Sequence, residues 1–140
     1  MNRITGPDLC HCLAARRAAR FTSRIYDGHL SAVGLSISQF SILALVQAQP
    51  GIVVGDLAER MVMERTTLMR ALKPLRDAGL LTASTEGARA ALSFTVSAAG
   101  MARLAEAEPY WRAAQAEFET KMGRKEAVAL RSDLLGAVFG

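Results

Sequence analysis

A short stretch of the chain gathers the side chains best suited to binding a polyanion. They are Arg65, Thr66, Thr67, Arg70 and Lys73. Arginine and lysine pair with phosphate, arginine also pairs with guanine, and threonine hydroxyls bond to phosphate oxygens or base edges. Glu64 is the one acid between Arg60 and Arg76. The pattern predicts a surface that contacts DNA, and the alternative is a basic helix face that meets only water.

Two short helices joined by a tight turn would position this surface. Leu57 and Met61 lie four residues apart on the first helix. On the second, apolar residues recur at steps of four and three, at Leu68, Leu72 and Leu75. Each helix therefore has one apolar stripe to bury, and the cations of the second lie on its other face. A helix-turn-helix of this kind inserts its second helix into the major groove of DNA.

The ends of these two helices carry different markers. The first helix is expected to begin at Val53-Val54 without a serine or threonine cap, which removes a hydrogen bond worth about 1 kcal/mol. Pro74 cannot donate to the carbonyl of Arg70, so we expect a bend or a weakened turn there. Gly79 is suited to the left-handed conformation that ends a helix.

Residues 80–96 have the pattern of a β-hairpin. An extended segment begins at Leu80, and residues 85–88 (Thr-Glu-Gly-Ala) are typical of a turn. The apolar residues that alternate in the second strand are Leu92, Phe94 and Val96. Arg89, near the hairpin tip, is placed to reach a minor groove or the flanking phosphates. Helix, helix, hairpin is the order of a winged helix.

The predicted helix nearest the N-terminus runs from Asp8 to about Leu30, with Pro7 and Asp8 as start signals. It carries four arginines, which are Arg16, Arg17, Arg20 and Arg24. We interpret them as a solvated face or as partners of acids in the C-terminal helices, rather than as DNA contacts.

The C-terminal part has the pattern of a self-association surface. After Ser97, which is suited to cap a helix, a stripe recurs at three- and four-residue steps. Its members are Met101, Leu104, Glu108, Trp111, Gln115, Phe118 and Met122. We expect Pro109 to interrupt or bend this helix, Gly123 to end it, and residues 126–139 to form a last helix that is apolar on nearly every side. A second copy of the chain would cover such helices most simply. The predicted dimerisation residues are Leu104, Trp111, Phe118, Leu130 and Leu134.

Taken in order, these segments resemble the MarR (multiple antibiotic resistance regulator) family of bacterial transcription factors. The matching segments are residues 34–40 (Gly-Leu-Ser-Ile-Ser-Gln-Phe), 56–58 (Asp-Leu-Ala), 65–68 (Arg-Thr-Thr-Leu) with Arg70, Leu75 with 79–80 (Gly-Leu), Arg89, and 96–100 (Val-Ser-Ala-Ala-Gly). The resemblance covers residues 8–140 and implies one domain with a mainly α fold and a small β-hairpin wing. In it, a winged helix-turn-helix at residues 36–96 stands on a base of dimerisation helices at residues 8–33 and 97–140.

The resemblance also implies a function. Members of the family are homodimers on a pseudo-palindromic operator, usually repressors that a small ligand or an oxidant releases. The wing departs from the usual Asp-Arg-Arg, because this chain has Ala88-Arg89-Ala90. One cation and the acid that orients it are missing, so we expect weaker wing contacts and a greater dependence on the recognition helix.

Two cysteines raise a second hypothesis, peroxide sensing by a regulator of the same fold. Two helical residues spaced like Cys10 and Cys12 point about 200° apart, so these thiols should neither bridge each other nor converge on a metal. The organic-hydroperoxide branch of the MarR family has a reactive cysteine on this helix, hydrogen-bonded to tyrosines. Cys12 matches it by ungapped alignment and Cys10 by local context. Tyr26 matches one tyrosine, but Ile37 replaces the second, so we expect two buried packing residues instead.

An enzyme is not expected, and neither is a cofactor or a metal. The chain has no Gly-x-Ser-x-Gly, P-loop or His-Glu-x-x-His motif, and its two histidines are His11 and His29. A winged helix used only for protein contacts is a third hypothesis, which the cations at Arg65, Arg70 and Lys73 disfavour.

The composition limits which kinds of partner are expected. Hydrophobic residues make up 51% of the 140 residues, which suggests apolar surface buried between subunits. No apolar stretch approaches the ~20 residues of a membrane span, and the N-terminal residues lack a signal-peptide pattern. We therefore expect a cytoplasmic protein that does not act at a membrane, with double-stranded operator DNA, a second copy and a small-molecule effector as partners. Tyr110 and Trp111 are positioned to line an effector pocket, although for Trp111 we favour simple core packing.

Overall fold

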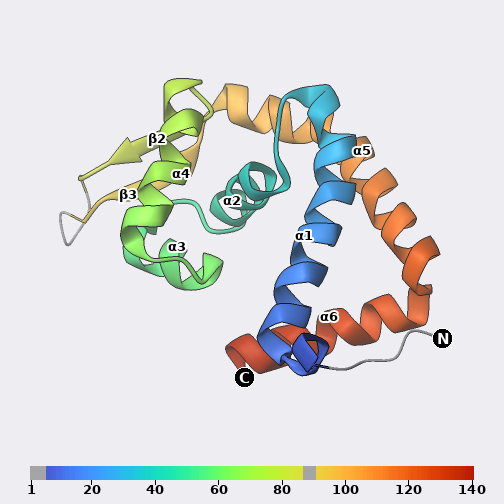
Figure 1. The fold of residues 1–140 in the computed structure, drawn as a ribbon. Coiled ribbons are helices and arrows are strands. Elements are labelled where there is room, and N and C mark those ends of the chain that lie inside the picture. The colour runs from blue at the N-terminus through green and yellow to red at the C-terminus, as the bar shows by residue number, and fades with distance from the viewer. Residues whose placement is uncertain (1–5, 87–90) are drawn as a thin grey trace. The chain divides into compact units, whose positions relative to one another are not determined.

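The computed structural model describes residues 6–86 and 91–140, which divide into two units (Figure 1). The helical unit holds residues up to Ala32 together with Pro109–Gly140, and the winged-helix unit holds Val33–Glu108. One helix, α5 (Ala98–Met122), contributes its first part to the winged-helix unit and its second part to the helical unit. The boundary between the two units therefore falls at Pro109. The sequence predicted that the C-terminal part of the dimerisation base begins at residue 97.

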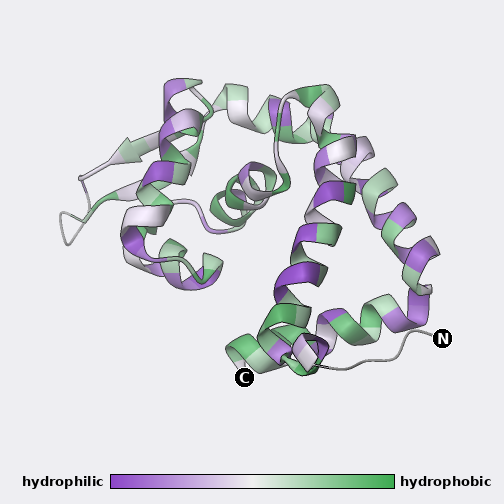
Figure 2. Cartoon of the chain, in the orientation of Figure 1, coloured by the Kyte–Doolittle hydropathy of each residue, from purple (hydrophilic) through white to green (hydrophobic). Residues whose placement is uncertain are grey.

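The helical unit is built from long helices with a small core. A 3-10 turn, η1 (Gly6–Leu9), precedes α1 (His11–Leu30), and α6 (Arg124–Phe139) follows the second part of α5. Gly123 ends α5 as expected, because its φ of 97° lies in the region that glycine adopts freely. The buried side chains of this unit are Ile25, Tyr26, Leu30, Ala114 and Ala127. Much of α6 is exposed and apolar, most visibly toward its C-terminal end (Figure 2).

The winged-helix unit begins with a short 3-10 turn and a well-capped helix. The turn η2 (Ser31–Val33) leads to α2 (Ile37–Ala48), where the Ser36 hydroxyl accepts from the Gln39 amide and the Gln39 side chain accepts from the Ser36 amide. This reciprocal pair satisfies two donors that a helix start otherwise leaves unpaired. Then follow β1 (Ile52–Val53), α3 (Val54–Met61), α4 (Arg65–Asp77), β2 (Leu81–Ser84) and β3 (Ser93–Val96).

The three strands form one antiparallel sheet in the order β1-β3-β2. Phe94 lies opposite Ile52 on one side and Ala83 on the other, and its side chain is fully buried. Helices α3 and α4 pack their leucines into the same core, since Leu57, Leu68 and Leu72 have no exposed surface. The two paired strands of the predicted hairpin and the leucine stripe of α4 are confirmed, whereas on α3 Leu57 is buried and Met61 is only half-buried.

Several predicted boundaries are also confirmed. Helix α3 begins at Val54, and its N-cap Val53 makes no side-chain capping bond. Gly79 has a φ of 74° after the end of α4, and the Ser97 hydroxyl accepts from the Gly100 amide at the start of α5. Strand β1 was not predicted from the sequence, because two residues are too few to show an alternating pattern.

The expectation that Pro109 could interrupt its helix is wrong, while the bend or weakened turn expected at Pro74 and the bend expected at Pro109 stay predictions. Helix α4 is continuous through Pro74 and α5 is continuous through Pro109. Pro74 lies in the last turn of α4, where its carbonyl still accepts from the amide of Ala78. A proline removes one donor from a helix, and the remaining backbone bonds and packing hold both helices together here.

The described residues include no single helix that is long and apolar enough to cross a membrane. One bent pair of helices meets that test together, by length and composition alone.

Gly100 supports the first stability prediction, because it lets α5 approach Leu80, the residue before β2. A Cβ atom at position 100 would lie 2.6 Å from Val96 Cγ1 and still closer to the Leu80 carbonyl oxygen. We expect Gly100→Ala to lower the free energy of unfolding by about 1–3 kcal/mol, since the backbone there cannot yield easily.

The matched control is Gly55→Ala on α3, where nothing lies within 4 Å of the added Cβ. This change should raise stability by roughly 0.5–1 kcal/mol, because alanine favours a helix over glycine. Urea unfolding followed by circular dichroism measures both. Equal effects of the two substitutions would contradict the close approach at Gly100.

Candidate DNA-binding surface

The orientation of α4 is set by the side chains that it buries. Leu68, Leu72 and Leu75 are at most 1% exposed, so this face of the helix is fixed against the core of the winged-helix unit. The turn before it passes through Val62, whose φ of 54° is left-handed. The amide of Val62 donates to the Glu59 carbonyl and closes the end of α3. Helices α3 and α4 are thereby joined in the helix-turn-helix that the sequence predicted.

Four of the predicted DNA-binding residues lie on α4 outside its buried leucine stripe. Arg65, Thr66, Thr67 and Arg70 are all exposed. Within the part of the chain that the structure describes, these four side chains have no ion pair or hydrogen bond to other side chains. Their guanidinium and hydroxyl groups are therefore available to acceptors and donors outside the chain.

The start of α4 adds backbone donors to this face. Its N-cap, Glu64, makes no side-chain capping bond, and its first turn holds no acid. The first amides of a helix have no partner within the helix, and the helix dipole makes this end positive. An uncapped helix start beside Arg65 and two threonine hydroxyls is therefore suited to a phosphate group.

Lys73 and Arg76 extend the positive charge toward the end of α4. Lys73 Nζ lies 2.7 Å from Asp77 Oδ2, one turn further along the helix. The lysine side chain remains 75% exposed, so this pair is weakly stabilising and can open when a phosphate approaches. This pair was not among the features predicted from the sequence, although the i to i+4 spacing of Lys73 and Asp77 indicates it.

The wing is described only in part. Strands β2 and β3 are paired from Leu81 with Val96 to Ser84 with Ser93. Arg89, the predicted wing contact, lies outside the described residues, as does the second half of the predicted turn at residues 85–88.

The predicted dimerisation residues differ in how much surface they offer. Leu104 is 6% exposed within the single chain, so its side chain has little area left for a partner. Trp111, Phe118 and Leu130 are half-buried, and Leu134 is 54% exposed. Trp111 is thus not a fully buried core residue, and its neighbour Tyr110 is 40% exposed.

The cysteines are exposed, and the expectation that they are buried packing residues is wrong for the single chain. Cys10 is the N-cap of α1 rather than a residue within it, and its Sγ accepts from the Leu13 amide at 3.4 Å. The angle of about 200° between two helical residues therefore does not apply to Cys10 and Cys12. Both thiols are free.

Tyr26 is not placed to activate a thiol of its own chain. It lies on α1 fourteen positions after Cys12, and at a rise of 1.5 Å per residue this is roughly 21 Å along the helix. Its hydroxyl instead donates to Gln115 Oε1 of α5. Burial raises the pKa of Tyr26, and the Glu119 carboxylate adds to that rise, while the Arg131 charge opposes it.

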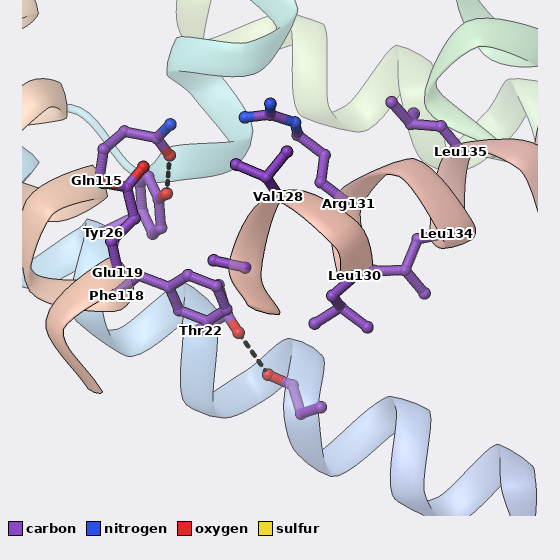
Figure 3. Close-up of a pocket in the computed structure, with 12 residues that line it drawn as sticks. Thr22, Tyr26, Gln115, Phe118, Glu119, Val128, Leu130, Arg131, Leu134 and Leu135 are labelled. Carbon is purple, nitrogen blue, oxygen red and sulfur yellow. Dashed lines mark hydrogen bonds between the residues drawn. The ribbon is translucent and has the colours of Figure 1, made fainter. Parts of the chain in front are cut away.

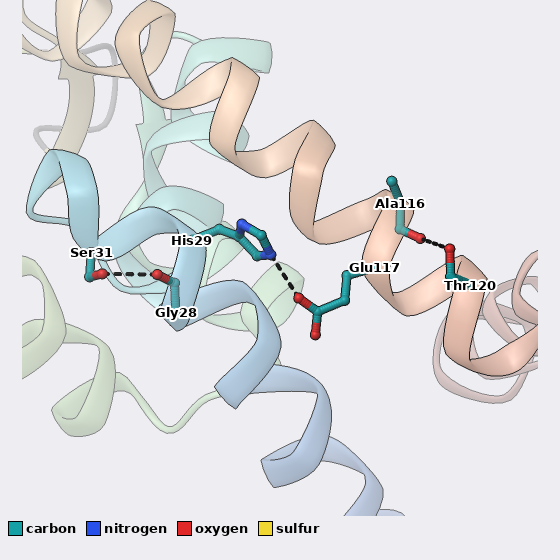
Figure 4. Close-up of polar contacts among 6 residues, drawn as sticks. All are labelled: Gly28, His29, Ser31, Ala116, Glu117 and Thr120. Atoms are coloured by element: carbon teal, nitrogen blue, oxygen red, sulfur yellow. Dashed lines mark hydrogen bonds and ion pairs between the residues drawn. The ribbon is translucent and has the colours of Figure 1, made fainter.

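The arginines of α1 are exposed, as expected, but their interpretation needs one correction. Arg17 pairs with Asp8 at 2.6 Å, so its partner lies in the N-terminal segment rather than in a C-terminal helix. The bonds that link α1 to α5 include the Tyr26 bond and a contact of 2.9 Å between His29 Nε2 and Glu117 Oε1 (Figure 4). Among the described residues, no group of three or more histidines, cysteines or acids could hold a metal.

Known proteins match this arrangement. A model of the MarR family matches residues 33–90, which include α2, α3 and α4. No curated protein sequence matches the chain. The M. tuberculosis transcriptional regulator MosR, solved in complex with DNA, is 34% identical, with 91% of this chain and 92% of that one covered and a TM-score of 0.81.

Two further solved structures share the fold. The transcriptional repressor CouR, bound to a 23-mer DNA duplex, is 22% identical, with 98% of each chain covered and a TM-score of 0.84. Bordetella bronchiseptica BpsR, whose DNA binding is regulated by 6-hydroxynicotinic acid, is 19% identical, with 97% and 98% covered and a TM-score of 0.83. The match of the helix-turn-helix to the family model and the 34% identity to MosR along most of both chains lead to one conclusion: the chain belongs to the MarR family of winged-helix, DNA-binding transcriptional regulators.

Proposed function

We propose that the chain is a homodimeric repressor that binds a pseudo-palindromic operator through α4 and is released by a small-molecule effector. The observation that carries this proposal is the uncapped start of α4 beside four exposed side chains that have no partner among the described side chains, Arg65, Thr66, Thr67 and Arg70. A basic face that served only solubility would not need an open helix start. A winged helix used for protein contacts would not need two arginines and two threonines around it.

Each residue of this face has a distinct proposed role. The first amides of α4, with Arg65, Thr66 and Thr67, bind phosphates at the edge of the major groove. Arg70 lies one turn and a half further along the exposed face and pairs with a base edge. Lys73 leaves Asp77 to meet a phosphate, and Arg89 contacts the flank of the site. Because the wing lacks a second cation, α4 supplies most of the sequence preference.

The second copy of the chain is proposed from the surface of α6. Leu134, Leu135, Val138 and Phe139 are each more than half exposed in the single chain. Apolar surface of this kind is normally covered in a soluble assembly, and a symmetric dimer covers it with the same surface of its partner. We assign residues 8–33 and 97–140 to this base, and its main contacts to Trp111, Phe118, Leu130 and Leu134. Two copies would place two recognition helices on half-sites about one turn of DNA apart.

Relatives support the remaining parts of the proposal. MosR was crystallised in complex with DNA, and CouR is described as a repressor bound to a DNA duplex. The DNA binding of BpsR is regulated by 6-hydroxynicotinic acid, a small molecule. By analogy we propose that a small molecule also releases this chain from its operator.

The role of Arg70 can be tested on a duplex that the parent protein selects from a random-sequence pool. We expect Arg70→Ala to weaken binding by about 1–3 kcal/mol, because a bidentate contact to a base edge is lost. Arg70→Lys keeps the charge, so it should restore binding only if the contact is to phosphate. Gel-shift titration at fixed salt measures both variants.

Arg17→Ala is the matched control, since it removes an exposed arginine from the helical unit and should leave affinity unchanged. Parent-like binding by Arg70→Ala would remove this residue from the interface. Failure of the parent to retain any duplex would favour the hypothesis of protein contacts alone.

Assembly is tested by the mass of the particle in solution. The chain has a mass of 15.0 kDa, and we expect a dimer of about 30 kDa with little folded monomer. Leu134→Glu should shift the protein toward monomer or unfolded chain, because a carboxylate would be buried without a partner. Thr82→Glu adds the same charge to an exposed position of the winged-helix unit, and it should leave the mass of the particle unchanged. A well-folded parent monomer at micromolar concentration in sedimentation experiments would contradict the dimer.

Peroxide sensing is retained as a second candidate because Cys10 and Cys12 are exposed and free. In this chemistry a thiolate attacks the O–O bond of a hydroperoxide, which gives a sulfenic acid and releases an alcohol or water. A second thiol then attacks the sulfenic sulfur, a disulfide forms and water leaves. Tyr26 does not reach Cys12 within one chain, so a tyrosine contact to this thiol would require the partner subunit.

We expect both thiols to react with a thiol reagent in the native protein nearly as fast as in urea, because neither is covered in the single chain. For this candidate, peroxide should weaken DNA binding, a thiol reductant should restore it, and Cys12→Ser should not respond. Cys10→Ser is the companion variant that shows which thiol reacts first. Operator affinity that survives peroxide in the parent would exclude sensing and leave the effector as the releasing agent.

A further inference from the structure

The end of the recognition helix α4 is fastened to the start of α5 by contacts that none of the proposed roles uses. After the last turn of α4, the Gly79 amide donates to the Arg76 carbonyl and the Leu80 amide donates to the Leu75 carbonyl. The carbonyls of Gly79 and Leu80 are both bound by one residue at the start of α5, Ser97. Both helix ends belong to the winged-helix unit (Figure 1).

The Ser97 hydroxyl makes two hydrogen bonds of different kinds. It donates to the Gly79 carbonyl at 2.5 Å and accepts from the Gly100 amide at 3.0 Å. The accepted bond caps α5, which is a common role of serine at a helix start. The donated bond adds nothing to α5, and it uses the one proton that a serine hydroxyl has. The side chain therefore serves two helices at once.

The backbone brings the same two helix ends into close contact. The Ser97 amide donates to the Leu80 carbonyl at 3.0 Å. A Cβ atom at position 100 would collide with that carbonyl oxygen, so Gly100 lets the first turn of α5 lie directly against it. The leucine stripe fixes the rotation of α4 about its axis. The contacts of Ser97 and Gly100 add a second constraint, on where the end of α4 lies against α5.

Helix α5 carries this constraint beyond the winged-helix unit. Its first part is bound to that unit at a further point, where Arg103 Nη1 donates to the Val33 carbonyl at 3.2 Å. The helix then continues without a break to Met122 in the helical unit. In the proposed dimer, this second part of α5 contacts the partner through Trp111 and Phe118. How firmly each α4 is held against α5 therefore affects how closely the separation of the two recognition helices is set.

We propose that Ser97 is a positioning residue for operator binding. Its hydroxyl fastens α4 to α5, and this fastening narrows the range of half-site separations that the dimer accepts. The dimer and its two half-sites rest on the proposed function. The fastening of α4 does not, and it is measured without DNA.

Ser97→Asp separates the two bonds of the hydroxyl. The carboxylate still caps α5, but it cannot donate to the Gly79 carbonyl. We expect the amides of Gly79 and Leu80 to exchange with solvent about three- to tenfold faster, as loss of one hydrogen bond implies, while the amides of α2 exchange as in the parent. Hydrogen exchange followed by nuclear magnetic resonance on the full-length protein measures this. Ser97→Thr keeps a hydroxyl and should exchange like the parent.

Two further variants control for charge and for folding. Ala99→Asp places the same charge at an exposed position in the first turn of α5 and should leave the exchange unchanged. Ser97→Gly removes the hydroxyl without adding a charge, and glycine is nearly as good a helix cap as serine. It should reproduce the faster exchange of Ser97→Asp. Parent-like exchange of Gly79 and Leu80 in both Ser97 variants would overturn the proposal.

The positioning role is read from the affinity for three duplexes. One is the operator that the parent selects, and the others have one base pair added or removed between the half-sites. We expect Ser97→Asp and Ser97→Gly to bind the operator about three- to tenfold more weakly and the altered duplexes as well as the parent does. A variant that merely lowers the folded fraction weakens all three equally, and this result would overturn the positioning role. Failure of the parent to retain any duplex would instead concern the proposed function, and the exchange of Gly79 and Leu80 would still decide whether Ser97 fastens α4.

Discussion

Burial of one leucine stripe determines what the winged-helix unit can do. Leu68, Leu72 and Leu75 occupy a single face of α4 and are almost fully buried, which fixes the rotation of the helix about its axis. Because an α-helix turns by about 100° per residue, that choice alone places Thr66 and Arg70 on the far side. The sheet contributes Phe94 to the same core. Affinity for a polyanion thus depends on apolar side chains that never touch it.

The features that follow from local spacing could be predicted from the sequence. The leucine stripe, the end of α4 at Gly79 and the exposure of Arg65 and Arg70 all depend on residues within two or three turns of one another. Features that depend on distant partners could not be predicted. Strand β1 pairs with β3 some forty residues away, and the exposure of Cys10 and Cys12 depends on which elements cover the start of α1.

The helical unit is stabilised by different contacts from the winged-helix unit. Its buried side chains include two alanines, and polar bonds from Tyr26 and His29 connect α1 to α5. Such a unit gains little stability from its own core, and α6 retains a large exposed apolar surface. The sequence showed this surface as a helix apolar on nearly every side. It did not show the half-open pocket that α1, α5 and α6 line (Figure 3), because a pocket arises from how helices meet rather than from any one of them.

Val62 shows what holds the turn between α3 and α4 in place. It is β-branched, and it is the one described residue other than glycine with a positive φ. A left-handed conformation costs such a residue roughly 1–2 kcal/mol, so the local sequence alone disfavours the turn. The buried leucines on both sides of it, Leu57 and Leu68, must offset that cost. The loop that gives the helix-turn-helix its name is therefore a consequence of packing in the core rather than of its own conformational preference.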